Sequence, residues 1–352
     1  MLFIPVSLAI RYYAPWHHDL ALFASAGLAI IPLAGWMGKA TEHLAVHLGQ
    51  GAGGLLNATF GNAAELIIAL FALSKGLTDV VKASITGSII GNVLLVLGMA
   101  IVGGGIKYKE QRFNRSGTRA AVTSLTLASI ALITPTIFHV TADLRHAAGY
   151  QLLQERLSLA IALVLFITYG CVLWFSLVTH QHFFRGEETE ETGEGWSLTR
   201  SILVLLLATI TVAVMSEVLV STVESARKTL GLSEVFVGVV VVAVIGNAAE
   251  HSSAVMAALK DKMDLSLSIT VGSSLQIALF VAPVLVFVSF LFGRPMDLEF
   301  SLPEISGVAL AVYILFQISG DGETNWLEGI QLLSVYLILA LLFYFLPPLT
   351  GS

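Results

Sequence analysis

Long apolar stretches alternate with short polar connections along almost the whole of this 352-residue chain. Ten of them approach or exceed about 20 residues, the length at which a helix crosses the hydrocarbon core of a bilayer. These stretches cover residues 20–48, 52–75, 79–104, 116–139, 153–180, 197–228, 233–259, 264–292, 301–318 and 326–346. A shorter apolar segment precedes them and predicts a short N-terminal helix. The pattern therefore predicts ten or eleven transmembrane helices.

A polar connection divides the chain into two halves of five helices each. It carries glutamates at positions 187, 188, 190, 191 and 194. Because five is odd, the second half enters the membrane from the opposite side, so a duplicated half forms an inverted repeat. We predict an all-α polytopic membrane protein built of two inverted five-helix repeats plus a short N-terminal helix. Its parts are the N-terminal helix (1–19), the first repeat (20–183), an acidic linker (184–196), the second repeat (197–346) and a C-terminal tail (347–352).

The composition agrees with a membrane protein. Hydrophobic residues make up 56% of the chain and charged residues 12%, whereas soluble domains carry about 25% charged residues. The net charge of −6 comes mostly from the linker glutamates, so it indicates little about partners. The single cysteine, Cys171, lies inside a predicted span and excludes a disulfide framework. The apolar N-terminus has no basic region ahead of it and does not predict a cleavable signal.

One polar motif occurs twice inside the apolar stretches. The string Gly61-Asn62-Ala63-Ala64-Glu65 returns as Gly246-Asn247-Ala248-Ala249-Glu250, an offset of 185 residues (from 61 to 246). On a helix, the asparagine and the glutamate of each copy share one face because they are three residues apart. Glutamate at the depth of a membrane is expensive to keep ionised and marks functional sites. The duplication supports the internal repeat and places one carboxylate and one amide from each half in a candidate site.

The next predicted helix of each half adds uncharged polar residues. Gly87-Ser88 matches Gly272-Ser273 at the same offset. Asn92, Ser274 and Gln276 lie close by in sequence. For the two glycines we expect close helix packing, which membrane helices commonly achieve with small residues. For Gln276, packing and cavity lining remain equal alternatives.

The residue types indicate a site for a hard cation. Glycine and asparagine are poor helix formers, so the backbone can open at Gly61 and Gly246 and expose carbonyls. Carboxylate, amide and carbonyl oxygens suit Ca²⁺ or a similar divalent cation. Two ionised glutamates in an empty low-dielectric site repel each other and lose solvation. One divalent cation or two protons neutralise the pair, which predicts a carrier that exchanges Ca²⁺ for H⁺ with Glu65 and Glu250 as the metal ligands.

Three further residues are candidates for a proton relay or an entry path. His251 adjoins Glu250, and histidine titrates near neutral pH. A hydrogen-bonded histidine between helices explains His251 equally well. Glu42 and Glu217 form a second acidic pair at an offset of 175 residues, within Ala40–Leu44 and Met215–Leu219. We expect them to lie nearer the ends of their helices.

Basic residues predict the orientation. Five crowd the loop near 105–118, which the positive-inside rule places in the cytoplasm: Lys107, Lys109, Arg112, Arg115 and Arg119. The acidic linker follows two spans later and is then cytoplasmic as well. Lys75, Lys82, Arg227 and Lys228 fall on the other side and weaken the bias.

The two motifs resemble the signature repeats of the Ca²⁺/H⁺ antiporter (CAX) family, within the Ca²⁺/cation antiporter superfamily. The resemblance includes the string from Gly53 to Glu65, the string from Ile245 to His251, and Gly272 to Gln276. It implies eleven helices, two inverted repeats and an acidic cytoplasmic segment between them. It also implies central roles for Glu65 and Glu250, surrounded by Asn62, Asn247, Ser88, Ser273, Gln276 and His251.

Other functions fit the sequence less well. Sodium/calcium exchangers generally carry a further acid in the second polar helix, yet neither 85–105 nor 265–291 contains Asp or Glu. Exchange of Na⁺, or of another divalent cation such as Mn²⁺, remains the alternative. The chain lacks the aspartate motifs of intramembrane enzymes. A passive channel is usually a symmetric oligomer around a pore, whereas this chain carries two repeats of its own. We expect no enzyme activity, no cofactor and no nucleic-acid partner, Ca²⁺ and H⁺ as substrates, and a prokaryotic plasma membrane as the location. Whether the chain forms a homo-oligomer is left open by the sequence.

Overall fold

A computed structural model describes residues 1–13, 19–145, 149–180 and 195–346. The acidic glutamates of the linker and the C-terminal tail lie outside the described residues, so their predicted places stay predictions. The elements in chain order are α1 (Phe3–Tyr13), α2 (Asp19–Phe60), α3 (Ala63–Ser74), α4 (Thr78–Ile90), η1 (Gly91–Val96), α5 (Leu97–Tyr108), β1 (Glu110–Arg112), α6 (Arg115–Leu144), α7 (Gln151–Trp174), η2 (Phe175–Thr179), α8 (Leu198–Leu230), α9 (Glu234–Phe236), η4 (Val237–Val242), α10 (Ala243–Gly246), α11 (Ala248–Leu259), α12 (Met263–Gln276), η5 (Ile277–Val281), α13 (Ala282–Leu291), α14 (Leu302–Ile318), β2 (Glu323–Asn325) and α15 (Trp326–Phe345).

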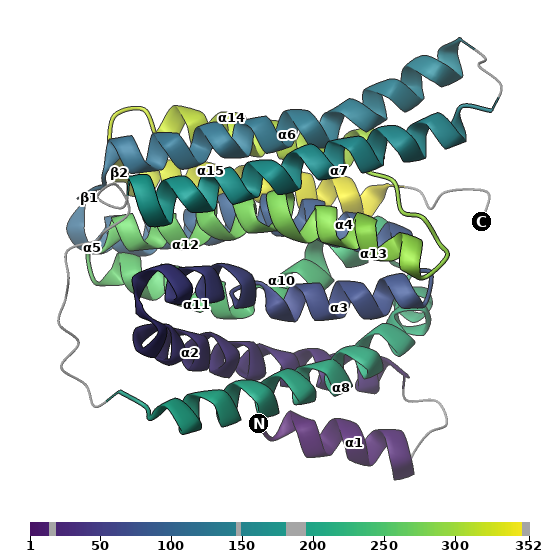
Figure 1. The fold of residues 1–352 in the computed structure, drawn as a ribbon, viewed down its shortest axis with the longest axis horizontal. Helices are drawn as coiled ribbons and strands as arrows, with labels where there is room; N and C mark the ends of the chain where they lie inside the picture. The colour runs from purple at the N-terminus through teal and green to yellow at the C-terminus, as the bar shows by residue number, and fades with distance from the viewer. Residues whose placement is uncertain (14–18, 146–148, 181–194, 347–352) are drawn as a thin grey trace.

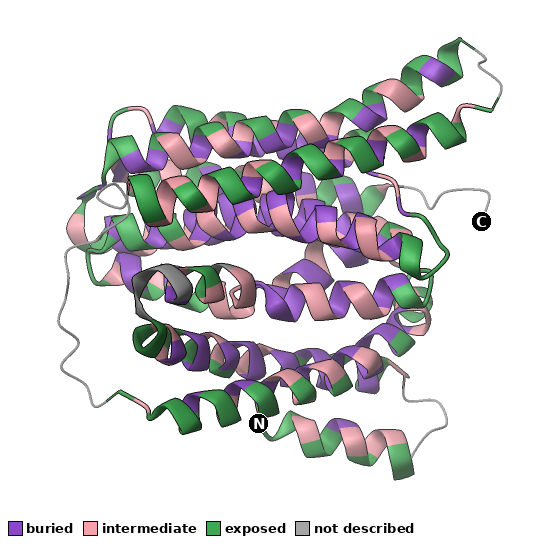
Figure 2. Ribbon diagram, in the orientation of Figure 1, coloured by how far each residue is buried: buried purple, intermediate pink, exposed green. Residues whose placement is uncertain are grey.

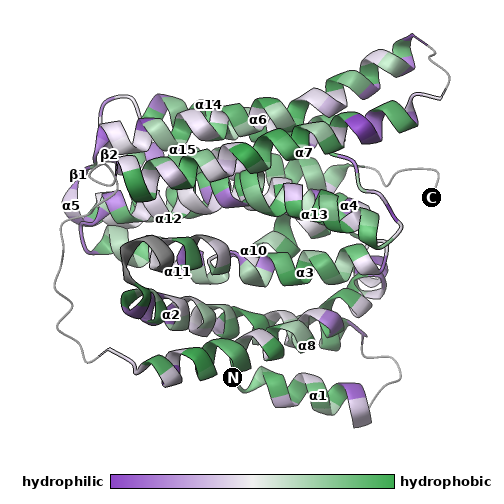
Figure 3. Ribbon diagram, in the orientation of Figure 1, coloured by the Kyte–Doolittle hydropathy of each residue, from purple (hydrophilic) through white to green (hydrophobic). Residues whose placement is uncertain are grey.

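The chain is a membrane-spanning helical bundle, as predicted. The predicted boundary between the spans 20–48 and 52–75 is wrong, because α2 continues to Phe60 and the chain breaks only at Asn62. Among the described residues, seven helical spans are long and apolar enough to cross a bilayer, and the bent series from α9 to α11 makes an eighth. The helices α3 and α14 are apolar but shorter, with 12 and 17 residues. The 11-residue α1 extends over only about 16 Å and is too short to cross. Apolar residues dominate the helices, while the polar ones gather near their ends (Figure 3).

Burial separates a central group of helices from a peripheral one. The series α4–η1–α5 is the most buried of the spans, and α7 the least. The outer helices expose large apolar side chains, such as Leu163 and Ile167 on α7 and Leu203 and Leu207 on α8 (Figure 2). Exposed leucine and isoleucine suit lipid contact, because lipid tails are as apolar as these side chains.

The helices around the two motifs keep a constant offset in the structure. The helices α3 and α11 begin and end at positions that differ by the same 185 residues as the motifs. The π-helical segments η1 and η5 interrupt the following spans at matching places. In Figure 1, the course from α4 to α5 runs opposite to the course from α12 to α13. The inverted repeat predicted from the odd number of helices is therefore confirmed.

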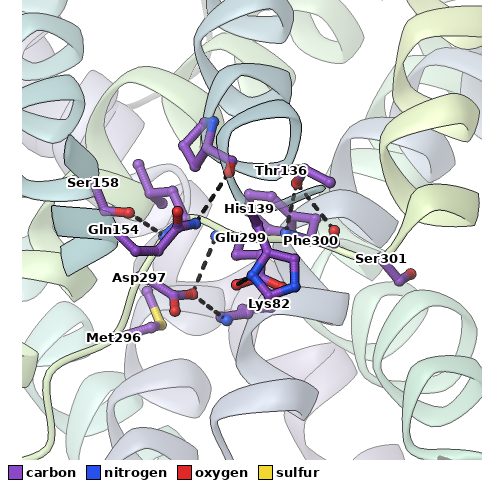
Figure 4. Close-up of polar contacts among 12 residues, drawn as sticks. Lys82, Thr136, His139, Gln154, Ser158, Met296, Asp297, Glu299, Phe300 and Ser301 are labelled. Carbon is purple, nitrogen blue, oxygen red and sulfur yellow. Dashed lines mark hydrogen bonds and ion pairs between the residues drawn. The ribbon is translucent and has the colours of Figure 1, made fainter. Parts of the chain in front are cut away.

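Short polar segments connect neighbouring parts of the chain at each end of the bundle. At one end, β1 and β2 pair in antiparallel fashion with Gln111 opposite Thr324, which joins the α5–α6 loop to the α14–α15 loop. At the other end, the connection between α13 and α14 carries two acids that pair with helices of the first repeat (Figure 4). Asp297 forms an ion pair with Lys82 of α4, and a Glu299 oxygen lies 3.1 Å from Nδ1 of His139.

Further hydrogen bonds fix the same connection. The Thr136 hydroxyl of α6 donates to the Phe300 carbonyl and accepts from the Phe300 amide, at 3.0 Å in both cases (Figure 4). Ser301 and Glu304 form a capping box at the start of α14. Glu304 also accepts a hydrogen bond of 3.0 Å from Thr86 of α4. These contacts hold α4, which also carries Ser88 of the candidate site, against α6 and α14.

Candidate cation-binding site

Both motif asparagines lie where a helix breaks. Asn62 lies between α2 and α3, and Asn247 separates α10 from α11, where the chain bends by 62°. Glycine followed by asparagine favours such a break, because neither residue stabilises a helix interior. Glu65 and Glu250 consequently fall in the first turns of α3 and α11. The positive end of a helix dipole favours a carboxylate at that position.

The Glu65 side chain reaches across the interface between the repeats. It is 8% exposed and packs against Gly246, where an added Cβ would lie only 2.8 Å from its Cγ. In the part of the chain that the structure describes, both carboxylate oxygens of Glu65 and Oε2 of Glu250 are buried and accept no hydrogen bond. Buried acceptors without a donor are costly, and a proton or a cation would satisfy them.

Asn92 forms the centre of a polar network between the repeats. Its Nδ2 donates to Oδ1 of Asn247 and to Oγ of Ser273, at 3.0 Å in each case. Nδ2 of Asn247 donates in turn to Oγ of Ser88 at 2.9 Å. Three of these four residues are 3% exposed or less, and Ser273 is 6% exposed. The motif of the second repeat is thus bonded to the polar helix of the first.

The opposite half of the network has the reciprocal arrangement. The Ser273 hydroxyl donates to Oδ1 of Asn62 at 2.8 Å, and Nδ2 of Asn62 donates to Oε1 of Gln276. An added Cβ at Gly61 would lie 3.3 Å from the same Gln276 oxygen. Gln276 therefore takes part in the polar network between the repeats.

Asn92 has a larger role than its position in the sequence predicts. The sequence places it near the site, whereas the structure shows that it joins the two halves of the network. It lies in the π-helical segment η1, and Gln276 lies directly before η5. Single π-helical turns within α-helices often occur at functional sites. The signal available in the sequence was an asparagine one helical turn after Ser88, inside an otherwise apolar stretch.

A narrow pocket extends from the site toward the turn between α3 and α4. Its lining includes Glu65, Ser88 and Gly246, together with Ser84 of α4. A second pocket shares Ser84 and three apolar residues with the first and continues to Leu77 along apolar side chains. The carboxylate of Glu65 thus borders a constriction that is mostly apolar.

The candidates for a relay differ in how far they are buried. His251 follows Glu250 in the first turn of α11 and is partly buried. Glu42 lies at an exposed position of α2. Glu42 and Glu217 both lie well inside their helices, α2 and α8, so the prediction that they are near helix ends is wrong. Glu217 of α8 forms an ion pair of 3.2 Å with Arg11 of α1, with 43% of its side chain exposed. This pairing was not anticipated, and it gives Glu217 a structural contact as well as a predicted relay role.

The two glycines of the polar helices differ. An added Cβ at Gly87 would lie 2.3 Å from the backbone oxygen of Val239, so the predicted close packing is confirmed there. At Gly272 an added Cβ would meet no heavy atom within 4 Å, so the same prediction is wrong. Ser274 donates to the Thr270 carbonyl of its own helix at 2.9 Å. Within the second polar helix, only the face carrying Ser273 and Gln276 takes part in the network.

The donor set consists of oxygens. Among the described residues there is no group of three or more His, Cys, Asp or Glu side chains that could hold a metal ion. The site instead combines two carboxylates with amide and hydroxyl groups. Such ligands suit Ca²⁺ and related hard cations, whereas softer metals prefer sulfur and imidazole.

Comparison with known proteins identifies the family. The family model described as sodium/calcium exchanger protein matches residues 18–178 and 200–345, which covers both repeats and both motifs. The chain belongs to this exchanger family. The predicted resemblance to cation antiporters is therefore confirmed.

Individual relatives of this exchanger are similar over nearly its whole length. A Ca²⁺/H⁺ antiporter of Aphanothece halophytica is 49% identical over 99% of the chain and 95% of the relative. The Ca²⁺/H⁺ antiporter ChaA of Bacillus subtilis is 47% identical over 92% of each. The solved structure of native YfkE superposes with a TM-score of 0.84, at 42% identity and 98% coverage of both chains.

Proposed function

We propose that this exchanger is a secondary antiporter that moves Ca²⁺ against H⁺ by alternating access. The observation that carries the proposal is the pair of motif glutamates: both oxygens of Glu65 and Oε2 of Glu250 are buried and lack hydrogen-bond donors among the described residues. Relatives named Ca²⁺/H⁺ antiporters, at 47–49% identity over at least 92% of the chain, support the same function. Export of Ca²⁺ across a prokaryotic plasma membrane, with the acidic linker in the cytoplasm, is part of the proposal.

The charge of the site explains the coupling. Glu65 and Glu250 contribute two negative charges, and the network residues around them are neutral. One Ca²⁺ or two protons cancel these charges, whereas the empty ionised pair is unstable in a low-dielectric environment. A carrier that changes its facing side only when the site is neutral therefore exchanges one ligand for the other.

The absence of a third acid in the sequence favours protons over Na⁺. The spans 85–105 and 265–291, which contain Asn92 and Gln276, carry no Asp or Glu. Binding of several Na⁺ ions would need more negative charge than two glutamates supply. The amide and hydroxyl groups of the network can complete a Ca²⁺ coordination sphere without adding charge.

The other predicted site residues receive supporting roles. We assign Asn62, Asn247, Ser88 and Ser273 to the shell around the cation, together with Gln276 and Asn92. Gly61 and Gly246 leave room for Gln276 and Glu65 at the helix breaks. His251 is assigned to proton transfer beside Glu250, and Glu42 and Glu217 to an entry path.

Transport by the purified protein in proteoliposomes tests the proposal. Uptake of radiolabelled Ca²⁺ is measured with the interior acidic, with and without an opposing Na⁺ gradient. We expect uptake to follow the pH gradient, to ignore Na⁺ and to disappear in Glu65→Gln and in Glu250→Gln. Glu299→Gln makes the same chemical change outside the site and should retain uptake. Uptake that needs Na⁺, or that survives either site substitution, would contradict the proposal.

A further inference from the structure

The two half-helices that carry the glutamates are held in different ways. Of the 12 residues of α3, seven are buried, whereas α11 buries only Ala254, Ala257 and Ala258. The N-terminal end of α11 is the 62° bend at Asn247, which gives no rigid continuation of α10. One face of α11 packs closely against α5 and α12, while more of its surface is exposed than that of α3. The direction of α11 therefore depends in part on what holds its C-terminal end.

Side chains from the α5–β1 segment hold the C-terminal end of α11. Nε2 of Gln111 donates to the Ala258 carbonyl and to Oδ1 of Asp261, at 2.9 Å in both cases. Lys107 and Tyr108 donate to the Leu259 carbonyl at 2.9 and 3.1 Å. The last carbonyls of a helix have no partner within the helix and carry partial negative charge, so donors and a cation are favourable there.

The Gln111 side chain is buried and closely packed at this position. It is 2% exposed and lies in the middle of β1, opposite Thr324 of β2. Gly104 leaves space for its amide, because an added Cβ there would lie 1.7 Å from Oε1 of Gln111. Figure 1 shows β1 and α5 at the same end of the molecule as the turn after α11.

Lys107, Tyr108, Gln111 and Asp261 together form a clamp on the end of α11. The other repeat has the same turn, but within the described residues it lacks these hydrogen bonds. After α3, Leu77 N bonds to the Ala72 carbonyl and Gly76 has a φ of +79°. After α11, Lys262 N bonds in the same way to the Ala257 carbonyl, and Asp261 has a φ of +60°. By the 185-residue offset, Asp261 replaces Gly76. Aspartate is less favourable than glycine in this left-handed conformation, yet its carboxylate accepts the bond from Gln111.

The donors are also specific to one repeat. At the same offset, Lys107, Tyr108 and Gln111 correspond to Phe292, Gly293 and Met296. None of these three side chains can donate a hydrogen bond to a helix terminus. Arg294 packs against Gly76 in the turn after α3, but among the described residues it makes no hydrogen bond to the end of that helix. The clamp therefore holds the more exposed half-helix, and its three donors are replaced by non-donor residues beside the more buried one.

We propose that Gln111 and Asp261 are positioning residues for Ca²⁺ transport, acting through α11 on Glu250. The clamp lies about 12 Å along the helix from Glu250, eight residues from Ala258 at about 1.5 Å each. With one end of α11 hinged at Asn247 and the other fixed by Gln111, the direction of the first turn is set. This inference rests on the proposed role of Glu250 in the site.

The test compares KM and Vmax for Ca²⁺ uptake in proteoliposomes with thermal unfolding in detergent. Gln111→Met and Asp261→Gly install the residues of the other repeat. We expect each to raise KM for Ca²⁺ three- to tenfold and to leave Vmax within twofold. Asp261→Gly should do so without lowering the melting temperature, because glycine relieves the positive φ. Asp261→Asn keeps an acceptor oxygen and tolerates the conformation, so its KM should stay within twofold of the wild type.

Glu250→Gln in the same assay separates the two proposals. If Glu250→Gln abolishes uptake while Gln111→Met and Asp261→Gly keep the wild-type KM, the clamp has no positioning role and the site proposal stands. A melting temperature that falls in Asp261→Gly together with an unchanged KM indicates a purely structural contact and also overturns the inference. If Glu250→Gln leaves uptake intact, the site proposal fails, and the clamp does not act through Glu250.

Discussion

Replacing Gly246 by alanine should displace Glu65 from the site. An added Cβ would lie 2.8 Å from Cγ of Glu65, whereas non-bonded carbon atoms settle at about 3.5–4.0 Å. Glu65 must therefore move by roughly 1 Å. Overpacking of this kind costs about 1–3 kcal/mol. Since 1.4 kcal/mol corresponds to a factor of ten, KM for Ca²⁺ should rise on the order of five- to a hundredfold.

Gly272→Ala is the matched control for this change. It makes the same substitution in the same bundle, but its Cβ would meet no heavy atom within 4 Å. Both variants are reconstituted, and initial rates of radiolabelled Ca²⁺ uptake are measured over a range of Ca²⁺ concentrations at fixed pH. We expect only Gly246→Ala to differ from the wild type. Equal KM values for the two variants would refute the contact between the repeats on which the proposed site depends.

Three further changes test the network and the α13–α14 connection. Asn92→Ala removes two hydrogen bonds worth about 0.5–1.5 kcal/mol each, so KM for Ca²⁺ should rise at least fivefold; an unchanged value in the uptake assay contradicts the network. Burial raises the pKa of Glu299 above its usual 4.5, and nearby Asp297 raises it further. The wild type therefore loses stability as pH rises above 4.5 toward that raised value. The melting temperature of Glu299→Gln minus that of the wild type should grow across this range. A difference that stays constant with pH would contradict the raised pKa of Glu299. Lys82→Met leaves Asp297 without its cation and should destabilise by about 1–3 kcal/mol, with most of the loss recovered in the double variant with Asp297→Asn when both are compared by thermal unfolding.

The architecture and the centre of the site followed from the sequence for physical reasons. Apolar stretches of bilayer length leave the backbone no alternative to helices in a membrane. The repeated pairing of glycine with asparagine predicted the breaks at Asn62 and Asn247, because these residues oppose helix formation wherever they occur. The offset between the two motifs is kept because α3 and α11 have the same length of 12 residues, and α4 and α12, which follow them, have 13 and 14.

Contacts between the repeats could not be derived in the same way. Which amide meets which hydroxyl depends on how the helices rotate about their axes, and the π-helical turn at η1 changes that rotation at Asn92. Gly87 and Gly272 occupy equivalent positions in sequence, yet only Gly87 faces a neighbouring backbone. The ion pair between Arg11 and Glu217 joins segments with no recognisable motif. Local patterns contain no information on such differences.

The connectivity of the polar network has a consequence for biosynthesis. Its hydrogen bonds join residues that are 155 to 214 positions apart, from Asn92 with Asn247 to Asn62 with Gln276. At about 5–20 residues per second, a ribosome needs roughly 10–40 s to make the 185 residues that separate the two motifs. During that interval the first half lies in the bilayer with amide and carboxyl groups whose native partners do not yet exist. Membrane insertion of this exchanger therefore passes through an intermediate in which the polar side chains of the first repeat are exposed. Any factor that shields these side chains should raise the yield of folded exchanger.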